Sequence, residues 1–447
     1  MSTGNLDLWR FYMKDITSPD SYIDMGFYYM INACLQRRVW LGSIERPCFP
    51  NLYVLLVGKA SVGKTQVIKP VTDFLTFHKA KHRLEPHGSL CLIEGDKPKT
   101  DEAMEIVDEV ASHNKSTSSM FMQQKNLKEV PLVFPVSADS ITYEALIMDH
   151  SSSTRFFPVK ELVGDTFKTF VRAGKYKHCS LNFLLEEIST LFRKKTGDVC
   201  KYLLKAYDCG DYTHKTKGGG IDIVTNMCLN ILGGTVPDFV GRSADDDLIN
   251  DGFISRSIIV YGEERRFERF EAIFTDEQKM AKIEILRHLF KLSKLFGQVS
   301  FSPEAHAFMT NYVEKVLPAN KVNKDPKLDT YYGRKALHAR KMAMSMHFAD
   351  QWTSMEIQLE SCLKAIAILD KLEINMHLAL GAGTVSPVGK CTQRILETIR
   401  KKGPQNDVEL MLELVMDFDP DLIVKSIIFL KQAEKIITKD GKYAIKI

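Results

Sequence analysis

Runs of apolar residues alternate with helically spaced stretches over the first 270 residues of the chain. Four of the runs have the length and apolar character of buried strands: 51–57, 179–185, 227–233 and 257–261. Such an alternation predicts a parallel sheet with helices on its faces. We therefore expect an α/β core over residues 48–270.

The regions on either side of this core are helical in pattern. Residues 1–47 and 271–382 carry apolar positions at helical spacing, and a linker rich in small residues ends the second region. In residues 388–447, three short amphipathic stretches precede two alternating strands around Asp440-Gly441, a strong hairpin turn. Three helices and a hairpin predict a winged helix. DNA contact and a structural or partner-binding role remain equally open for this domain.

The composition indicates an ordinary globular protein. Of its 447 residues, 45% are hydrophobic and 26% are charged, and a net charge of +4 does not by itself indicate a nucleic-acid ligand. The nine cysteines are scattered without a C-x-x-C pair, which favours reduced thiols over a disulfide framework or a zinc site. The start of the chain has no signal-peptide pattern and no apolar run reaches membrane-spanning length, so we expect a cytoplasmic protein without a membrane partner.

One segment fits the phosphate-binding loop pattern G-x-x-x-x-G-K-[ST] without a mismatch. Its residues, all candidates for nucleotide binding, are Gly58, Lys59, Ala60, Ser61, Val62, Gly63, Lys64 and Thr65. An apolar strand precedes the segment and a helix can begin after it, which is the context that makes the pattern specific rather than a chance turn. The loop N–H groups would wrap the phosphates of ATP, while Lys64 would reach the β- and γ-phosphates and Thr65 would bind Mg²⁺.

Two adjacent acids follow the apolar run that ends at residue 185. A phosphate loop needs such acids at the end of a neighbouring strand, because one orients Mg²⁺ through water and the next polarises the attacking water. We assign the first role to Glu186 and the role of catalytic base to Glu187. The alternative is an exposed acidic start of a helix.

Two further polar residues follow or precede predicted strands. Thr235 ends the next apolar run and can hold the attacking water or the γ-phosphate, although threonine is also common at strand ends for turn reasons. Arg256 lies just before a strand, where an arginine needs an anion; the alternative is a salt bridge with the acidic run 245–247. Together with the acids, these residues favour a ring ATPase over a small-molecule kinase.

In this order, the motifs resemble those of AAA+ ATPases of the minichromosome maintenance helicase type. They resemble more closely a family of phage and prophage P-loop proteins described as helicases or as a domain of unknown function. The resemblance covers residues 20–350 and is carried by 50–58, Glu186-Glu187, 231–237 and 252–256. It implies an ATP- and Mg²⁺-dependent enzyme, located in the host cytoplasm if a phage encodes it.

The same resemblance implies roles for two arginines. Arg256 corresponds to an arginine finger given to the neighbouring subunit, although Ser255-Arg256-Ser257 lacks the aromatic residue of the family pattern. Arg334 lies where such proteins have a lid helix with a second sensing arginine, and a solvated basic helix face is the alternative.

A third implication concerns DNA. Hexameric helicases of this type have a hairpin, between the acidic pair and the Thr235 strand, that projects into the central pore. Its candidate DNA contacts here are Tyr212, His214, Lys215 and Lys217. Cations suit the DNA backbone and an aromatic ring suits base stacking. The alternative is a surface hairpin that ends in a flexible glycine run.

The predicted fold is therefore α/β: an AAA+ type P-loop core with an N-terminal helical segment, a helical lid and a C-terminal winged helix. The predicted function is an ATP-driven, ring-forming DNA motor, a phage or mobile-element replicative helicase. We expect a homo-oligomer, a hexamer by resemblance, that binds single-stranded DNA and uses a separate primase or polymerase chain. Alternatives are an ATP-switch initiator or loader that does not unwind DNA, and a non-replicative defence-type ATPase.

Overall fold

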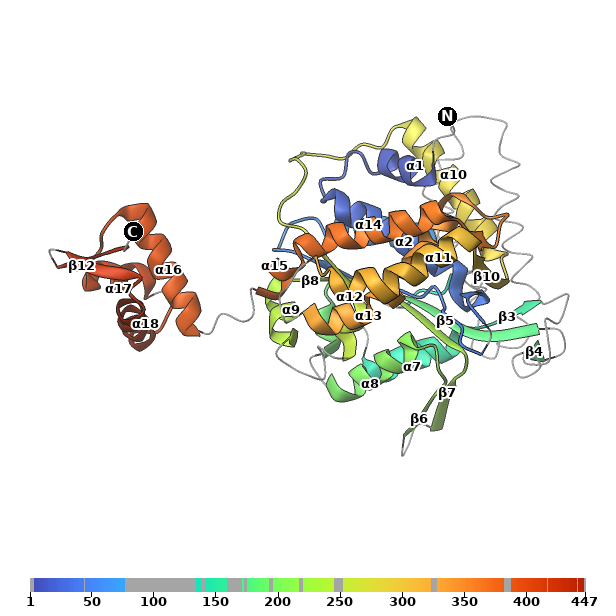
Figure 1. Ribbon diagram of the computed structural model, residues 1–447, viewed down its shortest axis with the longest axis horizontal. Helices are drawn as coiled ribbons and strands as arrows, with labels where there is room; N and C mark the ends of the chain where they lie inside the picture. Colours follow the sequence, from blue (N-terminus) through green and yellow to red (C-terminus); the bar gives the residue numbers. More distant parts are fainter. Residues whose placement is uncertain are drawn as a thin grey trace, which may run out of the picture. The chain divides into compact units, whose positions relative to one another are not determined.

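The computed structural model divides the chain into two compact units, Met1–Ala379 and Leu380–Ile447 (Figure 1). The residues that it describes are 4–43, 45–76, 134–137, 142–158, 171–172, 175–192, 196–216, 220–244, 252–322, 328–381, 387–415, 417–439 and 441–445. We describe each unit by itself.

A mixed sheet with four adjacent parallel strands forms the centre of the larger unit. Its strand order is β3 (Thr154–Pro158), β5 (Lys175–Leu185), β8 (Met227–Thr235), β2 (Tyr53–Val57), β9 (Ser257–Tyr261). The strands β5, β8, β2 and β9 are parallel, whereas β3 and the short β4 (Val171–Arg172) pair with β5 in antiparallel fashion. The predicted α/β class is confirmed. The strands were recognisable because a parallel sheet is covered on both faces, which requires continuous apolar runs.

Helices cover both faces of this sheet. On one face lie α2 (Asp20–Leu35) and α3 (Thr65–Leu75), and on the other lie α8 (Thr196–Tyr207) and the 3₁₀ helix η3 (Ile188–Phe192). Every residue of α2 from Tyr22 onward is buried. This helix is apolar all round because it packs against the sheet, α10 (Asp276–Ser293) and α13 (Asp329–Asp350) at once.

Three short strands lie in regions that the sequence pattern assigned to helices. They are β1 (Val39–Leu41), β10 (Gly297–Phe301) and β11 (Glu356–Ile357), and they form a parallel sheet in the order β1-β10-β11. The prediction that residues 1–47 and 271–382 are helical is therefore wrong at these three strands. Strands of two to five residues whose partners lie far along the chain leave little periodic signal.

The remaining elements of the larger unit are helical or form a hairpin. They are α1 (Asn5–Tyr12), η1 (Gln36–Arg38), α7 (Tyr143–Ser152), β6 (Tyr212–Thr216), β7 (Gly220–Val224), α9 (Pro237–Ala244), η5 (Ile254–Arg256), α11 (Pro303–Asn311), η6 (Tyr312–Val316), α12 (Leu317–Ala319), α14 (Leu359–Ile374) and α15 (Met376–Gly381), the last of which ends in the smaller unit.

The smaller unit has three helices followed by a hairpin. They are α16 (Pro387–Lys402), α17 (Asp407–Leu414), α18 (Pro420–Gln432) and the antiparallel pair β12 (Ile436–Lys439) and β13 (Lys442–Ile445). A separate apolar core, including Leu410 and Ile427, holds them together. The Asp419 carboxylate accepts a hydrogen bond of 2.9 Å from the Asp421 amide, so it caps the start of α18.

The structure can be compared with two expectations from composition: reduced cysteines and the lack of a membrane-spanning segment. The eight cysteines among the described residues are all free thiols. Within the same part of the chain, no helix combines the length and the apolar character that crossing a bilayer requires.

A buried ion pair between α13 and α14 provides a test of the fold. Lys335 is 1% exposed, and its ammonium lies 2.6 Å from the carboxylate of Glu373, which is fully buried. The substitution Lys335→Ala would leave that carboxylate buried without its cation, which typically costs about 3–5 kcal/mol of unfolding free energy. We expect a loss of this size in urea unfolding followed by circular dichroism.

The matched control is Lys364→Ala, because Lys364 pairs with Glu360 on the exposed side of α14, at 2.7 Å. Exposed pairs contribute little, so this variant should unfold like the parent protein. Equal free energies of unfolding for the two variants would contradict the stabilising role of the buried pair.

Candidate nucleotide-binding site

The phosphate loop joins the end of β2 to the start of α3, and its conformation requires the glycines of the motif. Gly63 has a φ of 101° and Ser61 a φ of 68°, so left-handed backbone occurs at both positions. A Cβ atom on Gly58 would lie 2.5 Å from the carbonyl oxygen of Gly262 and 2.6 Å from the Tyr22 hydroxyl oxygen. Alternation of left-handed with ordinary backbone turns successive N–H groups toward one point, which suits an anion.

Lys64 lies across this loop. Its ammonium donates hydrogen bonds to the carbonyl oxygens of Gly58, at 2.7 Å, and Lys59, at 3.0 Å. Burial lowers the pKa of the Lys64 ammonium, and the charge of Glu187 acts in the opposite direction. The predicted loop cation and the predicted base therefore lie within electrostatic reach of each other.

Glu187 and Thr235 are hydrogen-bonded to each other. The Thr235 hydroxyl, which is fully buried, donates to the Glu187 carboxylate at 3.0 Å. The same carboxylate accepts from the backbone amide of Ser189 at 3.2 Å, at the start of η3. The contact with Thr235 fits the predicted role of Glu187 as catalytic base. The contact with the Ser189 amide fits the alternative, in which the acids begin a helix.

The strand order explains why these groups meet. In the sheet, β8 lies between β2 and β5, and Thr235 is directly opposite Val57 while Gly233 is opposite Leu185. Glu187 follows Leu185 by two residues and so reaches the level of Thr235. The carboxyl ends of parallel strands lie at one edge of a sheet, where ligands of open α/β sheets bind.

Glu186 and Thr65 lie at the same edge but have different neighbours. The Glu186 carboxylate is half exposed and lies 3.7 Å from the ammonium of Lys69 on α3. Thr65 is the first residue of α3 and is partly exposed. A hydroxyl and a carboxylate are oxygen donors of the kind that Mg²⁺ prefers, so these residues fit the ion. Their role in binding Mg²⁺ remains a prediction.

Arg256 lies at the opposite end of the strands, where the parallel strands β2 and β9 begin. It precedes Ser257, which pairs with Tyr53 at the start of β2. The four steps from Tyr53 to Val57 span roughly 13 Å, at about 3.3 Å per residue, and separate this end of the sheet from the loop. The Arg256 guanidinium is 7% exposed and lies 3.3 Å from the carboxylate of Asp208. An internal salt bridge therefore exists, as the alternative supposed, but with Asp208; the run 245–247 lies outside the described residues.

Arg334 lies on α13, one turn before His338, whose imidazole lies 3.2 Å from the carbonyl oxygen of Ser255, the residue that precedes Arg256. Both arginines act electrostatically on the Tyr207 hydroxyl, whose pKa burial raises. Arg334 also acts on His338, and burial lowers the pKa of that imidazole to about 3. The structure thus groups two of the predicted site arginines at the edge of the sheet remote from Lys64.

The predicted DNA hairpin is formed by β6 and β7 and extends from the body of the unit (Figure 1). The Tyr212 hydroxyl lies 2.6 Å from that of Tyr143, and the His214 ring packs edge-on against the same tyrosine. Lys215 is exposed, and it lies opposite Ile221, which is 56% exposed. Two of the four candidates therefore pack inward, Lys215 faces solvent, and Lys217 lies outside the described residues.

Several contacts of the loop escaped the sequence analysis. The Tyr22 hydroxyl donates to the carbonyl oxygen of Val57 at 2.6 Å, and the Ser18 hydroxyl donates to that of Gly63 at 2.7 Å. Arg265 donates to the carbonyl oxygen of Ser61 at 2.5 Å. No motif marks these residues, because they come from distant segments and act through the backbone of the loop.

Comparison with known proteins adds no family assignment. No model of a protein family matches the chain, and a search of curated proteins finds no match. Inference about function therefore depends on the site itself.

Proposed function

We propose that the chain is an ATP-driven, ring-forming DNA motor whose larger unit is an AAA+ type ATPase core. The observation that carries this proposal is the group at the carboxyl edge of the sheet: Lys64 over the phosphate loop and Glu187 bonded to Thr235. An anion-binding loop alone would suit any nucleotide-binding protein. A buried hydroxyl that orients a carboxylate next to the loop cation suits hydrolysis.

In this proposal the protein groups divide the work on ATP. The loop N–H groups and Lys64 bind the phosphates, and Mg²⁺, held by Thr65 and through water by Glu186, would neutralise phosphate charge when bound. Glu187 accepts a proton from the attacking water, and the Thr235 hydroxyl holds the carboxylate in place. Positioning and electrostatic stabilisation of this kind account for most of the catalysis of phosphoryl transfer.

Assembly into a ring follows from where the arginines lie. In this proposal, charge on the γ-phosphoryl group is stabilised by a cation in addition to Lys64. Arg256 lies at the end of the sheet remote from the loop of its own chain, and Arg334 lies on α13, which packs against η5. A neighbouring subunit can supply them if its remote edge faces the loop. Head-to-tail contacts of this type close into rings, and a hexamer is the size that the family resemblance implies. Arg256 would then exchange Asp208 for the nucleotide.

DNA is the proposed track of the motor. The hairpin of β6 and β7 extends beyond the packed body and presents Lys215 to solvent, which suits contact with the phosphates of a single strand. Single-stranded DNA is favoured because a hairpin that projects into a central pore contacts a strand passing through it.

The second candidate, an ATP-switch loader or initiator, is favoured by a different observation. We assign a winged-helix fold to the smaller unit, and its helix α18 exposes Val424, Ile428 and Phe429 by 45%, 49% and 54%. A helix that reads DNA needs basic and polar side chains on its outer face. The apolar face suits a protein partner, such as a separate primase or polymerase chain.

Substitutions at the loop and at the acid should have different effects. Lys64→Ala should abolish hydrolysis and weaken ATP binding, because it removes the cation that contacts the transferred phosphate. Glu187→Gln should keep ATP bound but prevent its cleavage, because the amide retains a bond to Thr235 and cannot act as a base. Binding of a fluorescent ATP analogue and phosphate release measure the two effects. Hydrolysis by Glu187→Gln at the wild-type rate would refute the assignment of the base.

Arg256 should act on the nucleotide of the neighbouring subunit. Arg256→Ala should bind ATP normally and hydrolyse it roughly 10³-fold more slowly, the lower end of the range for arginine fingers. A mixture with Lys64→Ala protein should regain activity, because some interfaces then combine an intact loop with an intact finger. Two results would exclude action in trans: a wild-type rate for Arg256→Ala, and full activity of a protein that stays monomeric with ATP and DNA.

Lys215 should contribute to DNA binding. Lys215→Ala should reduce the affinity for single-stranded DNA and flatten its salt dependence. Binding releases counterions at each phosphate contact, so a variant with one contact fewer releases fewer of them. The control is Lys371→Ala, which removes an exposed cation from α14. Fluorescence anisotropy across a salt titration measures both. If the two variants bind like the parent, DNA contacts another surface.

A further inference from the structure

We propose that Ser18 and Arg265 are positioning residues that hold the phosphate loop in its anion-binding conformation from outside. This inference rests on the nucleotide-binding part of the proposed function. It does not depend on DNA, on ring formation or on the identity of the catalytic base.

Each residue holds one carbonyl group of the loop. The Ser18 hydroxyl donates to the carbonyl oxygen of Gly63 at 2.7 Å, and Nε of Arg265 donates to that of Ser61 at 2.5 Å. Ser61 and Gly63 are the two loop residues with left-handed backbone. The external hydrogen bonds therefore fall on the two positions whose conformation defines the loop.

Peptide geometry connects these bonds to anion binding. No cis peptide bond occurs among the described residues, and in a trans peptide the C=O and N–H groups point in opposite directions. A carbonyl that is held from outside turns the N–H of the next residue toward the inside. Ser61 thus directs the N–H of Val62, and Gly63 directs the N–H of Lys64. These inward N–H groups are the ones that would contact phosphate.

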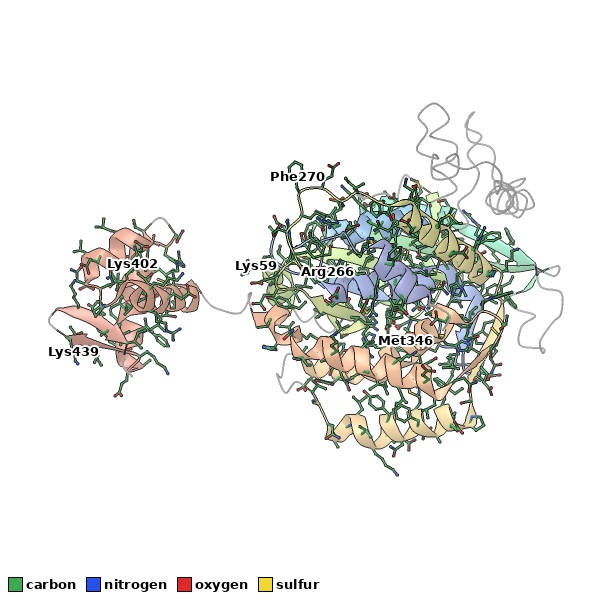
Figure 2. All side chains as sticks on the ribbon, turned by 90° about the horizontal axis from the view of Figure 1, so that it is seen from above. Lys59, Arg266, Phe270, Met346, Lys402 and Lys439 are labelled. Carbon is green, nitrogen blue, oxygen red and sulfur yellow. The ribbon has the colours of Figure 1, made fainter. Side chains whose placement is uncertain are left out.

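The two residues come from different segments that are themselves joined. Ser18 lies in the connection between α1 and α2, and Arg265 lies in the connection between β9 and α10. The neighbouring Arg266 donates to the Met13 carbonyl oxygen at 3.0 Å and pairs with Asp20 at 2.9 Å. Figure 2 labels Arg266 together with Lys59 of the loop. The two connections therefore form one support under the loop.

Each of the two side chains has a further contact besides its hydrogen bond to the loop. Ser18 is fully buried, and a Cβ atom on Gly63 would lie 2.7 Å from its hydroxyl oxygen, so serine and glycine pack in direct contact. Arg265 is held at its other end by Glu268, whose carboxylate lies 2.8 Å from the guanidinium. Contacts that hold the loop in its anion-binding conformation before the nucleotide arrives lower the cost of binding.

Removing either contact should weaken nucleotide binding without slowing chemistry. We expect Ser18→Ala to raise the Kd for ATP about tenfold and Arg265→Ala about threefold, since a hydrogen bond typically contributes a factor of this order. The loss should be equal for ADP, because the inward N–H groups contact phosphates that both nucleotides share. At saturating ATP, kcat should stay within about twofold, so the effect appears in KM. Arg265→Lys should recover part of the affinity.

The control is Arg269→Ala, because Arg269 pairs with Asp15 between the same two connections but makes no contact with the loop among the described residues. It should bind both nucleotides like the parent. Unchanged Kd values for Ser18→Ala and Arg265→Ala, or an equal loss in Arg269→Ala, would overturn the inference. If the variants behave as expected but DNA never stimulates hydrolysis, the motor proposal fails and this inference stands; a parent protein that binds neither nucleotide would refute both.

Discussion

The close approach of the ends of β5 and β8 is the constraint on which the candidate site depends. A Cβ atom on Gly234 would lie 2.4 Å from the carbonyl oxygen of Glu186, and one on Gly233 would lie 2.9 Å from the Ile188 side chain. Only glycine lets the chain turn after Leu185 directly across the neighbouring strand. This turn places the Glu187 carboxylate on the Thr235 hydroxyl, and Thr235 is already held level with Val57 by the sheet.

The polarity of the sheet then separates two kinds of polar group. The phosphate loop, the acids and Thr235 lie at the carboxyl edge, whereas Arg256, Asp208 and Arg334 lie at the amino edge. The length of β2 separates Arg256 from the loop of the same chain. The proposal of a ring ATPase uses this separation, because a head-to-tail contact would bring the amino end of one sheet to the carboxyl end of the next.

Interior charges in the larger unit serve the fold in some places and the candidate site in others. The cation of Lys335 is matched by Glu373 inside the helical layer, and Arg37 donates hydrogen bonds to the carbonyl oxygen of Met227, at 3.0 Å, and to that of Cys209. These groups have partners inside the protein and need no ligand. Lys64 differs, because its partners are carbonyl groups of the phosphate loop itself, where a phosphate would also bind.

The sequence by itself determined the four parallel strands of the main sheet, the phosphate loop and the helices of the smaller unit, because each depends on contiguous residues. An apolar run, a glycine pattern or a cap such as Asp419 is local, and local patterns survive in a single sequence. Tertiary structure alone decided that Asp208 is the partner of Arg256, that the helix of Arg334 packs against η5, and that Tyr212 and His214 pack inward. It also brought Ser18 and Arg265 to the loop, from 45 and 204 residues away along the chain. Contacts between such distant segments follow from how strands are ordered and faces are covered, and no periodicity in the sequence encodes that order.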